Sequence, residues 1–145
     1  MVEVRFYDTV DDSLLKFAVI IARSNGKWVF CKHRERDTLE CPGGRREPGE
    51  GIDETAAREL REETGAAEFT LRQVCVYSVT GKTRVNAAGG ESFGMLYCAE
   101  ISQFDREVHS EIERVFLLDD LPERWTYPDI QPLLLQEAAR RTANR

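Results

Sequence analysis

The chain has 145 residues, of which 41% are hydrophobic and 32% are charged, a balance that is ordinary for a globular domain with its own apolar core. Its formal net charge of -6 argues against a general nucleic-acid-binding surface, because phosphate backbones are bound by basic patches. We therefore expect a single domain over residues 1–145 without a stable nucleic-acid partner.

The sequence shows no signal for export or membrane insertion. Its first residues, MVEVRFYDTVDD, lack a basic region followed by an apolar stretch, and the longest apolar run, Phe17 to Ala22, is too short to cross a bilayer. We expect a cytoplasmic protein with no membrane partner. The four cysteines form no CxxC pair, which disfavours a zinc site and indicates reduced, buried thiols. They are Cys31, Cys41, Cys75 and Cys98.

Hydrophobic periodicity predicts three strands in the first third of the chain. Val2, Val4 and Phe6 alternate as in an edge strand, whereas Leu15 to Ala22 is a nearly continuous apolar run, typical of a buried central strand. The turn at 24–27 contains Asn-Gly, a strong hairpin signal. The segment 28–33 should therefore return antiparallel to the central strand.

A glycine turn and a helix are expected next. A charged loop at 34–38 leads through residues 39–41 into Pro42-Gly43-Gly44, where glycine permits a tight and irregular backbone path. In the helix that follows, Ile52, Ala56, Leu60 and Thr64 form a row spaced four apart, which predicts its buried face. Gly65 is placed as a C-cap should be.

The rest of the chain predicts further strands and a terminal helix. Aromatic and aliphatic residues favour strands at Phe69 to Val79, Ser92 to Ile101 and Ile112 to Leu118, with a loop at Gly81 to Gly90. Asp129 to Thr142 should form the last helix. Strands with one helix before and one after the last of them predict an α/β fold, an alpha/beta/alpha sandwich with a central mixed sheet.

Three carboxylates crowd one turn of the first predicted helix. Residues three and four apart are neighbours on a helix, so Glu59, Glu62 and Glu63 project from the same side, and their like charges oppose the helix. A divalent cation such as Mg²⁺ or Mn²⁺ relieves that repulsion, because hard cations prefer oxygen ligands. The alternative is a solvated acidic face that is partly neutralised by Arg58 and Arg61.

The residues around this cluster favour the metal site. Gly44 is followed after five residues by Glu50, and after seven more by the run RELREETGA at 58–66. This pattern resembles the signature box of the Nudix hydrolases. One departure is Ala66, where larger branched residues are usual, and it affects packing more than chemistry. The order of predicted strands around the box is similar to the family as well, so the resemblance extends to most of the chain.

The resemblance implies a fold, a reaction and a metal. Nudix hydrolases cleave a nucleoside diphosphate linked to another group X by attack of water on phosphorus, with magnesium or manganese. By resemblance, Glu59, Glu62 and Glu63 are the metal ligands, and the carbonyl of Gly43 joins them. Arg58 resembles the partner of Glu50 in an ion pair that orients the loop and the helix, so it belongs with the catalytic residues.

The resemblance leaves more than one candidate for the general base and for the contacts to the substrate. Members of the family take the base from the box helix or from a glutamate downstream, where this chain offers Glu111 and Glu113; both also fit ordinary surface residues. For the phosphates, Lys32 and Arg34, with Arg36 beside them, stand where the family has basic residues, and Gly44 is included as a substrate contact. A solvated surface role for Lys32 fits equally well.

Two groups of residues receive no site role from the sequence. His33 and His109 are expected to be ordinary surface or strand residues. Several aromatic residues could stack on a base, but aromatic residues in strands are usually core, so none is assigned. These are Tyr77, Phe93, Tyr97, Trp125 and Tyr127.

The substrate is inferred by elimination. Marks of the ADP-ribose, dinucleoside polyphosphate and coenzyme A subfamilies are missing, so the chain looks closest to the MutT-like nucleoside triphosphate pyrophosphohydrolases. The resemblance then implies conversion of a nucleoside triphosphate, either an ordinary one or an oxidised one such as 8-oxo-dGTP, to the monophosphate and pyrophosphate. Alternatives are ADP-ribose, a nucleotide sugar, an RNA 5′ end, or a nucleotide sensor without turnover. Homodimers are frequent for this fold.

Overall fold

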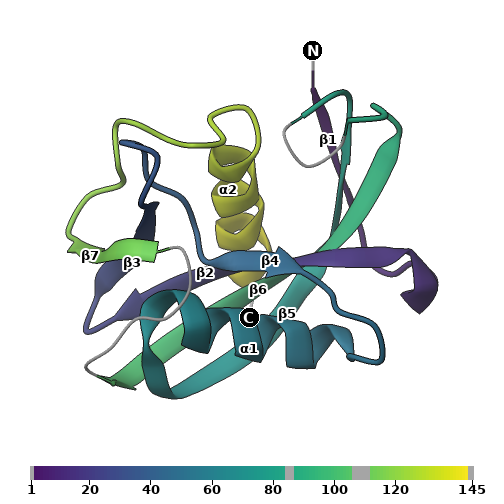
Figure 1. Ribbon diagram of the computed structural model, residues 1–145. Coiled ribbons are helices and arrows are strands. Elements are labelled where there is room, and N and C mark those ends of the chain that lie inside the picture. The colour runs from purple at the N-terminus through teal and green to yellow at the C-terminus, as the bar shows by residue number, and fades with distance from the viewer. Residues whose placement is uncertain (1, 84–86, 106–111, 144–145) are drawn as a thin grey trace.

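The structure is a computed structural model that describes residues 2–83, 87–105 and 112–143, without the side chain of Glu113 (Figure 1). Its elements in chain order are β1 (Glu3–Tyr7), the 3-10 helix η1 (Asp12–Leu14), β2 (Leu15–Ser24), β3 (Lys27–His33), β4 (Gly43–Arg45), α1 (Ile52–Thr64), β5 (Ala66–Thr80), β6 (Glu91–Phe104), β7 (Ile112–Leu118) and α2 (Gln131–Thr142).

One mixed, seven-stranded sheet organises the chain. Six strands follow the order β1-β5-β6-β2-β3-β7, with β2 and β6 parallel and the other pairs antiparallel. The edge of β2 opposite β6 is shared, because residues 22–24 pair with β3 while residues 17–19 pair with β4. The sheet therefore forks at the middle of β2, and β4 occupies one branch.

The two helices cover opposite faces of this sheet, α1 below it and α2 above it in the view of Figure 1. Side chains alternate along β2. Ala18 and Ile20 therefore pack in the core cluster between the sheet and α1, whereas Ile21 packs in the cluster between the sheet and α2. The arrangement confirms the predicted alpha/beta/alpha sandwich with a central mixed sheet.

Helix α1 agrees closely with its sequence pattern. The four residues of the predicted row are all buried, and Ala56 and Leu60 have no exposed surface. The carboxylate of Glu54 accepts a hydrogen bond from the backbone N–H of Gly51 at the start of the helix. Gly65 ends it in the left-handed region at φ 76°, where a side chain would be strained. The Asn-Gly hairpin between β2 and β3 also forms.

Some boundaries and one local cause differ from the prediction. Strand β5 begins at Ala66, directly after the cap, because the hydroxyl of Thr64 accepts a hydrogen bond from the Ala66 N–H and turns the chain into the sheet. Residues Gly43 and Gly44 are regular strand residues in β4 and neither has a positive φ. The predicted irregular turn is thus wrong, and the need for glycine there has another origin, described below.

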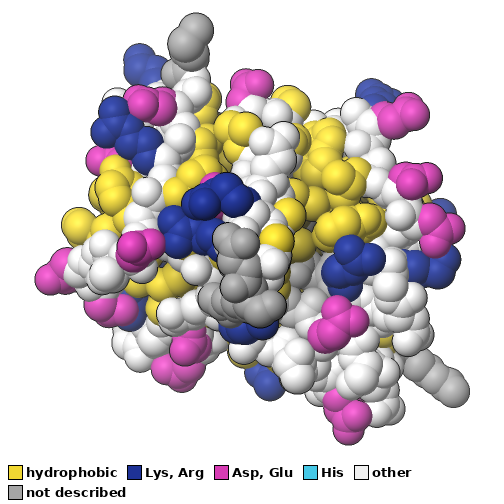
Figure 2. All heavy atoms as spheres, turned by 180° about the vertical axis from the view of Figure 1, so that it is seen from behind, with side chains coloured by type: hydrophobic (Ala, Val, Ile, Leu, Met, Phe, Trp, Pro, Cys, Tyr) yellow, Lys and Arg dark blue, Asp and Glu magenta, His cyan; other side chains and the backbone are white. Residues whose placement is uncertain are grey.

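The back of the molecule mixes hydrophobic patches with charges of both signs (Figure 2). The large hydrophobic residues that are exposed in the described parts of the chain come from separate elements and the loop after β7. They are Leu14, Leu117, Leu121 and Leu133. Within residues 2–83, 87–105 and 112–143, no helix is long and apolar enough to cross a membrane.

Packing of α1 on the sheet should dominate stability. Leu60 is fully buried, so we expect Leu60→Ala to lower the free energy of unfolding by about 2 to 5 kcal/mol through lost burial and a residual cavity. Leu133→Ala, at a side chain that is 41% exposed, is the matched control and should change it by less than about 0.5 kcal/mol. Chemical denaturation measures both, and equal effects would contradict this account of the core.

Candidate active site

The acid-bearing face of α1 opens onto a cleft. Glu59, Glu62 and Glu63 come from one turn of the helix, next to the buried row, and differ in depth: their side chains are 13%, 42% and 11% exposed. We call this cleft of about 670 Å³ the acid cleft. Its other lining residues are His33, Arg45, Arg46, Glu47, Pro48 and Arg58.

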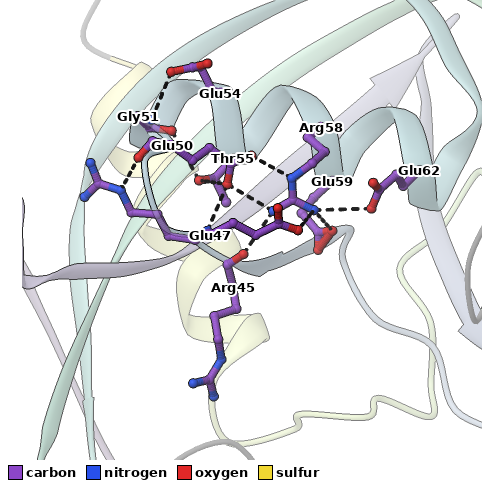
Figure 3. Close-up of polar contacts among 10 residues, drawn as sticks. Arg45, Glu47, Glu50, Gly51, Glu54, Thr55, Arg58, Glu59 and Glu62 are labelled. Atoms are coloured by element: carbon purple, nitrogen blue, oxygen red, sulfur yellow. Dashed lines mark hydrogen bonds and ion pairs between the residues drawn. The ribbon is translucent and has the colours of Figure 1, made fainter.

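Arg58 is the central cation of the acid cleft (Figure 3). Its Nε donates to Glu50 Oε2 at 2.7 Å, and its Nη2 donates to Glu50 Oε1 at 3.1 Å, so the predicted ion pair is present and bidentate. The same guanidinium donates through Nη1 to Glu59 at 2.9 Å and to Glu62 at 3.3 Å. It therefore also contacts two of the three proposed metal ligands directly, in line with the partial neutralisation by Arg58 that the sequence offered as the alternative to a metal.

Glu50 fastens the loop before α1 to the helix. Its carboxylate accepts from Arg58, from the backbone N–H of Glu47 at 3.0 Å and from the hydroxyl of Thr55 at 2.7 Å. Arg58 stabilises the ionised form most, and these bonds together lower the pKa of Glu50 to about 2. The guanidinium of Arg58 additionally donates to the carbonyl of Arg45, which joins β4 to the same network.

The deeper carboxylates have the opposite electrostatics. Burial raises the pKa of Glu59 to about 7, and the neighbouring Glu62 adds to the shift while Arg58 opposes it. Burial also raises the pKa of Glu63, with further contributions from nearby acids and an opposing hydrogen bond from the N–H of Gly43 at 2.8 Å. Burial among other acids thus disfavours the charged forms of Glu59 and Glu63.

The two glycines of β4 are required by space. A Cβ on Gly44 would lie 1.6 Å from Glu59 Oε2, and a Cβ on Gly43 would lie 2.4 Å from the carbonyl oxygen of Ala18. At Gly43 the obstacle is the backbone of β2, so a side chain would push β4 off that strand, whereas at Gly44 the Glu59 carboxylate would have to move. Gly43 also donates its N–H to Glu63, and the metal and substrate roles that the sequence gives to the two glycines stay predictions.

His33 requires a correction, because its ring lies at the acid cleft. Its Nε2 is 3.3 Å from Glu40 Oε2 and 3.8 Å from Glu63 Oε2, and Arg36 donates to the other oxygen of Glu40 at 3.0 Å. Sequence reasoning missed Glu40, which is only 7% exposed. A signal existed, since an acid placed between Leu39 and Cys41 in a strand-like run must find a partner when buried.

The remaining predicted contacts are not brought to the acid cleft. Lys32 and Arg34 line a separate depression with Thr38 and Thr126. Alternation on β3 explains this, because Cys31 faces α1, where its thiol contacts the Glu63 carbonyl, and its neighbour Lys32 points to the other face.

The two downstream glutamates remain predictions. Glu111 and His109 lie outside the described residues, and of Glu113 only the backbone in β7 is described. That strand begins at Ile112, opposite His33.

A second cleft lies on the α2 side of β4, with a volume of about 190 Å³. We call it the β4 cleft. Gly43, Gly44 and Arg45 line it, and Arg45 lines the acid cleft as well. Of the aromatic candidates for stacking, Tyr77 and Tyr127 line this cleft, while the others pack elsewhere. Its apolar wall consists of Phe17, Val19, Tyr77, Val79, Ile130 and Leu134.

An alpha/beta/alpha sandwich with this cluster of acids on helix α1 is characteristic of one class of protein. The NUDIX domain family matches residues 13–137, and the chain belongs to the Nudix hydrolases, enzymes that act on pyrophosphate bonds with divalent metal ions. It is 33% identical over 123 residues, 84% of this chain and 73% of the relative, to YtkD of Bacillus subtilis (strain 168), whose name assigns it 8-oxo-dGTP diphosphatase activity provisionally.

Solved structures agree with this assignment. A mutant of the Bacillus subtilis pyrophosphohydrolase BsRppH superposes with a TM-score of 0.77 at 28% identity, covering 96% of this chain and 90% of that one. A MutT NUDIX hydrolase from Burkholderia pseudomallei has a TM-score of 0.64 at 22% identity, covering 83% and 95%, a likeness of fold alone.

The acids of the acid cleft fit a hard divalent cation, since such cations prefer carboxylate oxygens as ligands. Across the described parts of the chain, however, no three His, Cys, Asp or Glu side chains are already gathered as a metal cage. Arg58 instead neutralises Glu59 and Glu62.

The ion pair of Glu50 makes a prediction for acid stability. Because folding lowers the pKa of Glu50 from 4.5 to about 2, its contribution is fully present above pH 4.5 and is lost as the pH falls through about 2. We expect Glu50→Gln to lower the free energy of unfolding at pH 7, and its difference from the wild type to shrink steadily below pH 4.5. Denaturation at several pH values measures this. The exposed Glu123→Gln serves as control, and a pH-independent difference would contradict the assignment.

Proposed function

We propose that the protein hydrolyses a nucleoside 5′-triphosphate to the monophosphate and pyrophosphate with Mg²⁺ or Mn²⁺, and that 8-oxo-dGTP is among its substrates. One observation carries the proposal: strand β4 separates the acid cleft from the β4 cleft, and Arg45 lines both. A molecule with a polyphosphate at one end and a flat apolar base at the other matches this pair of clefts. The similarity to YtkD supports an oxidised purine as the base.

The metal would be held by Glu59, Glu62 and Glu63 together with the carbonyl of Gly43. It would supply a polarised phosphate and an activated water, and offset charge on the leaving group. The chain's own contribution is orientation. Arg58 and Glu50 fix the loop and the helix, and the Gly43 N–H holds the Glu63 carboxylate in place.

The phosphate-binding cation is better sought on β4 than on β3. Arg45 is exposed, lines both clefts, and has its guanidinium carbon 5.2 Å from the ring centre of Phe17. Its position between the two clefts suits a contact to the phosphates that link them. Lys32 and Arg34 keep a role only if the substrate extends to their depression.

The general base is proposed among the acids of α1, with Glu111 and Glu113 as the alternatives downstream. A base must stand within hydrogen-bond reach of the attacking water and be unprotonated at the working pH. In the described parts of the chain, His33 is the nearest ring nitrogen to these acids, with its Nε2 3.8 Å from Glu63 Oε2 and 3.3 Å from Glu40 Oε2.

The likeness to BsRppH favours a second candidate with the same chemistry. A pyrophosphohydrolase can act on a 5′-triphosphate carried by a longer molecule, such as an RNA end, because the bond that breaks is the same. The net charge of -6 disfavours an extended nucleic-acid surface but leaves room for a single terminal nucleotide.

The direct test is a product analysis with Mg²⁺, Mn²⁺ or a chelator. The panel contains 8-oxo-dGTP, the ordinary nucleoside triphosphates, a 5′-triphosphorylated RNA, ADP-ribose and a nucleotide sugar. Metal-dependent release of pyrophosphate from a free nucleotide supports the proposal, and release from RNA alone supports the second candidate. Cleavage of ADP-ribose or a sugar nucleotide only, or tight binding without products, overturns it.

Removal of a single metal-binding carboxylate should stop catalysis without unfolding the protein. We expect Glu62→Gln and Glu63→Gln to lower kcat/KM at saturating Mg²⁺ by about 100-fold or more, because the metal supplies several kcal/mol of transition-state stabilisation. Glu54→Gln on the same helix is the matched control, since glutamine can still accept the hydrogen bond from Gly51. Undiminished activity of either variant would contradict the metal-ligand assignment, with circular dichroism as the check on folding.

Metal binding should release protons near neutral pH. In the free protein the pKa of Glu59 is about 7 and that of Glu63 is raised, whereas a metal requires ionised carboxylates. The apparent affinity for Mg²⁺ should therefore rise between about pH 6 and 8. Binding of one metal ion should release more protons near pH 6 than near pH 8. Titration calorimetry in buffers of different ionisation enthalpy measures both quantities. Equal affinity across this range would contradict the raised pKa values.

A further inference from the structure

The β4 cleft is sized for part of a nucleotide. Its volume of about 190 Å³ is below the ~300 Å³ at which pockets for whole drug-sized ligands begin, and its walls are mostly apolar. A planar base fits this description, whereas a charged phosphate does not. Selectivity between bases must then come from the few polar groups that reach the cleft.

Gln131, the first residue of α2, is the most constrained of these groups. It lines the cleft and is 5% exposed. Its side-chain oxygen accepts a hydrogen bond from the backbone N–H of Cys41 at 2.8 Å. Because only the oxygen of an amide can accept from an N–H, this bond determines which end of the side chain is the nitrogen.

The amide nitrogen of Gln131 is left for a ligand. It donates to no group in the described residues, and no side-chain nitrogen or oxygen there is both fully buried and unpartnered. The nitrogen therefore keeps some accessible surface, and the residue that carries it lines the β4 cleft. A buried amide N–H₂ that is held in one orientation is a hydrogen-bond donor and cannot serve as an acceptor.

We propose that Gln131 selects bases that carry a keto oxygen at the edge facing it, as guanine, hypoxanthine and 8-oxoguanine do, over bases that carry an amino group there. The proposal rests on the proposed function, since it assigns the β4 cleft to the base. A keto oxygen accepts from the fixed N–H₂, whereas the amino group of adenine would meet it donor to donor. The mismatch leaves two buried polar groups without partners, which is costly.

The other polar groups of the cleft do not reverse this preference. Both carboxylate oxygens of Glu40 already have partners, one in Arg36 at 3.0 Å and the other in the His33 ring nitrogen Nε2 at 3.3 Å. The hydroxyls of Tyr77, Thr83, Ser92 and Tyr127 can each donate or accept, so they suit either kind of base. Arg45 only donates, and the proposed function assigns it to the phosphates. Gln131 is therefore the group that discriminates.

The test exchanges the donor for an acceptor without changing the shape. In Gln131→Glu one oxygen can still accept from Cys41, while the other replaces the N–H₂ that faces the cleft. The matched control is Gln136→Glu, which makes the same change on an exposed residue of α2. The substrates are inosine and adenosine triphosphates, which differ in the exocyclic group and the adjacent ring nitrogen.

For the wild type and Gln136→Glu, kcat/KM should favour inosine triphosphate about 10 to 100-fold, the value of one unsatisfied hydrogen bond. Gln131→Glu should lose or invert that ratio while retaining turnover of adenosine triphosphate. A merely structural role would lower both rates together and leave the ratio unchanged. An unchanged ratio in Gln131→Glu, or a wild-type ratio near one, would overturn the proposal.

Binding without metal separates this inference from the proposed function. Calorimetry with inosine and adenosine monophosphates, on the same three proteins, needs no turnover. If no triphosphate is hydrolysed but inosine monophosphate binds more tightly and Gln131→Glu removes the difference, the proposed reaction fails and the role of Gln131 stands. If triphosphates are hydrolysed and the two monophosphates bind equally to the wild type, the role of Gln131 fails and the reaction stands.

Discussion

The structure depends on how one guanidinium holds together a crowded set of carboxylates. Like charges at helical spacing oppose α1, and Arg58 offsets this by pairing with Glu50, Glu59 and Glu62 at once. Its bond to the Arg45 carbonyl extends the same network to β4. Charge neutralisation and the joining of loop, helix and strand are thus one interaction.

The second constraint is that strand β4 carries no side chain at Gly43 and Gly44. Gly43 and Gly44 let β4 lie against both the backbone of β2 and the carboxylate of Glu59, where any Cβ would collide. The thin strand then has acids on one side and an apolar cleft on the other. A charged group and a flat apolar group can bind side by side without either being placed in the wrong environment, which is why a nucleoside triphosphate suits the arrangement.

The predictions that the structure confirms concern residues close together in sequence. The buried row of α1 and its Gly65 cap follow from the helical repeat, and the Glu50–Arg58 pair, which the family resemblance implied, lies in the same short segment. Sequence reasoning failed where partners are distant. His33 was taken for an ordinary residue because Glu63 follows 30 positions later, and nothing local joins Gln131 to Cys41 across 90 residues.

The sequence by itself determined the family, the sandwich and the acids of the box, because periodicity and short spacings dictate which side of a helix or strand a residue occupies. Only the tertiary structure decided that Lys32 points away from the acids, that Glu40 and His33 meet Glu63, and that β4 divides two clefts. These features arise from the forked pairing of β2 with β3 and β4. Such long-range register is set by packing of the whole sheet, which no local pattern contains.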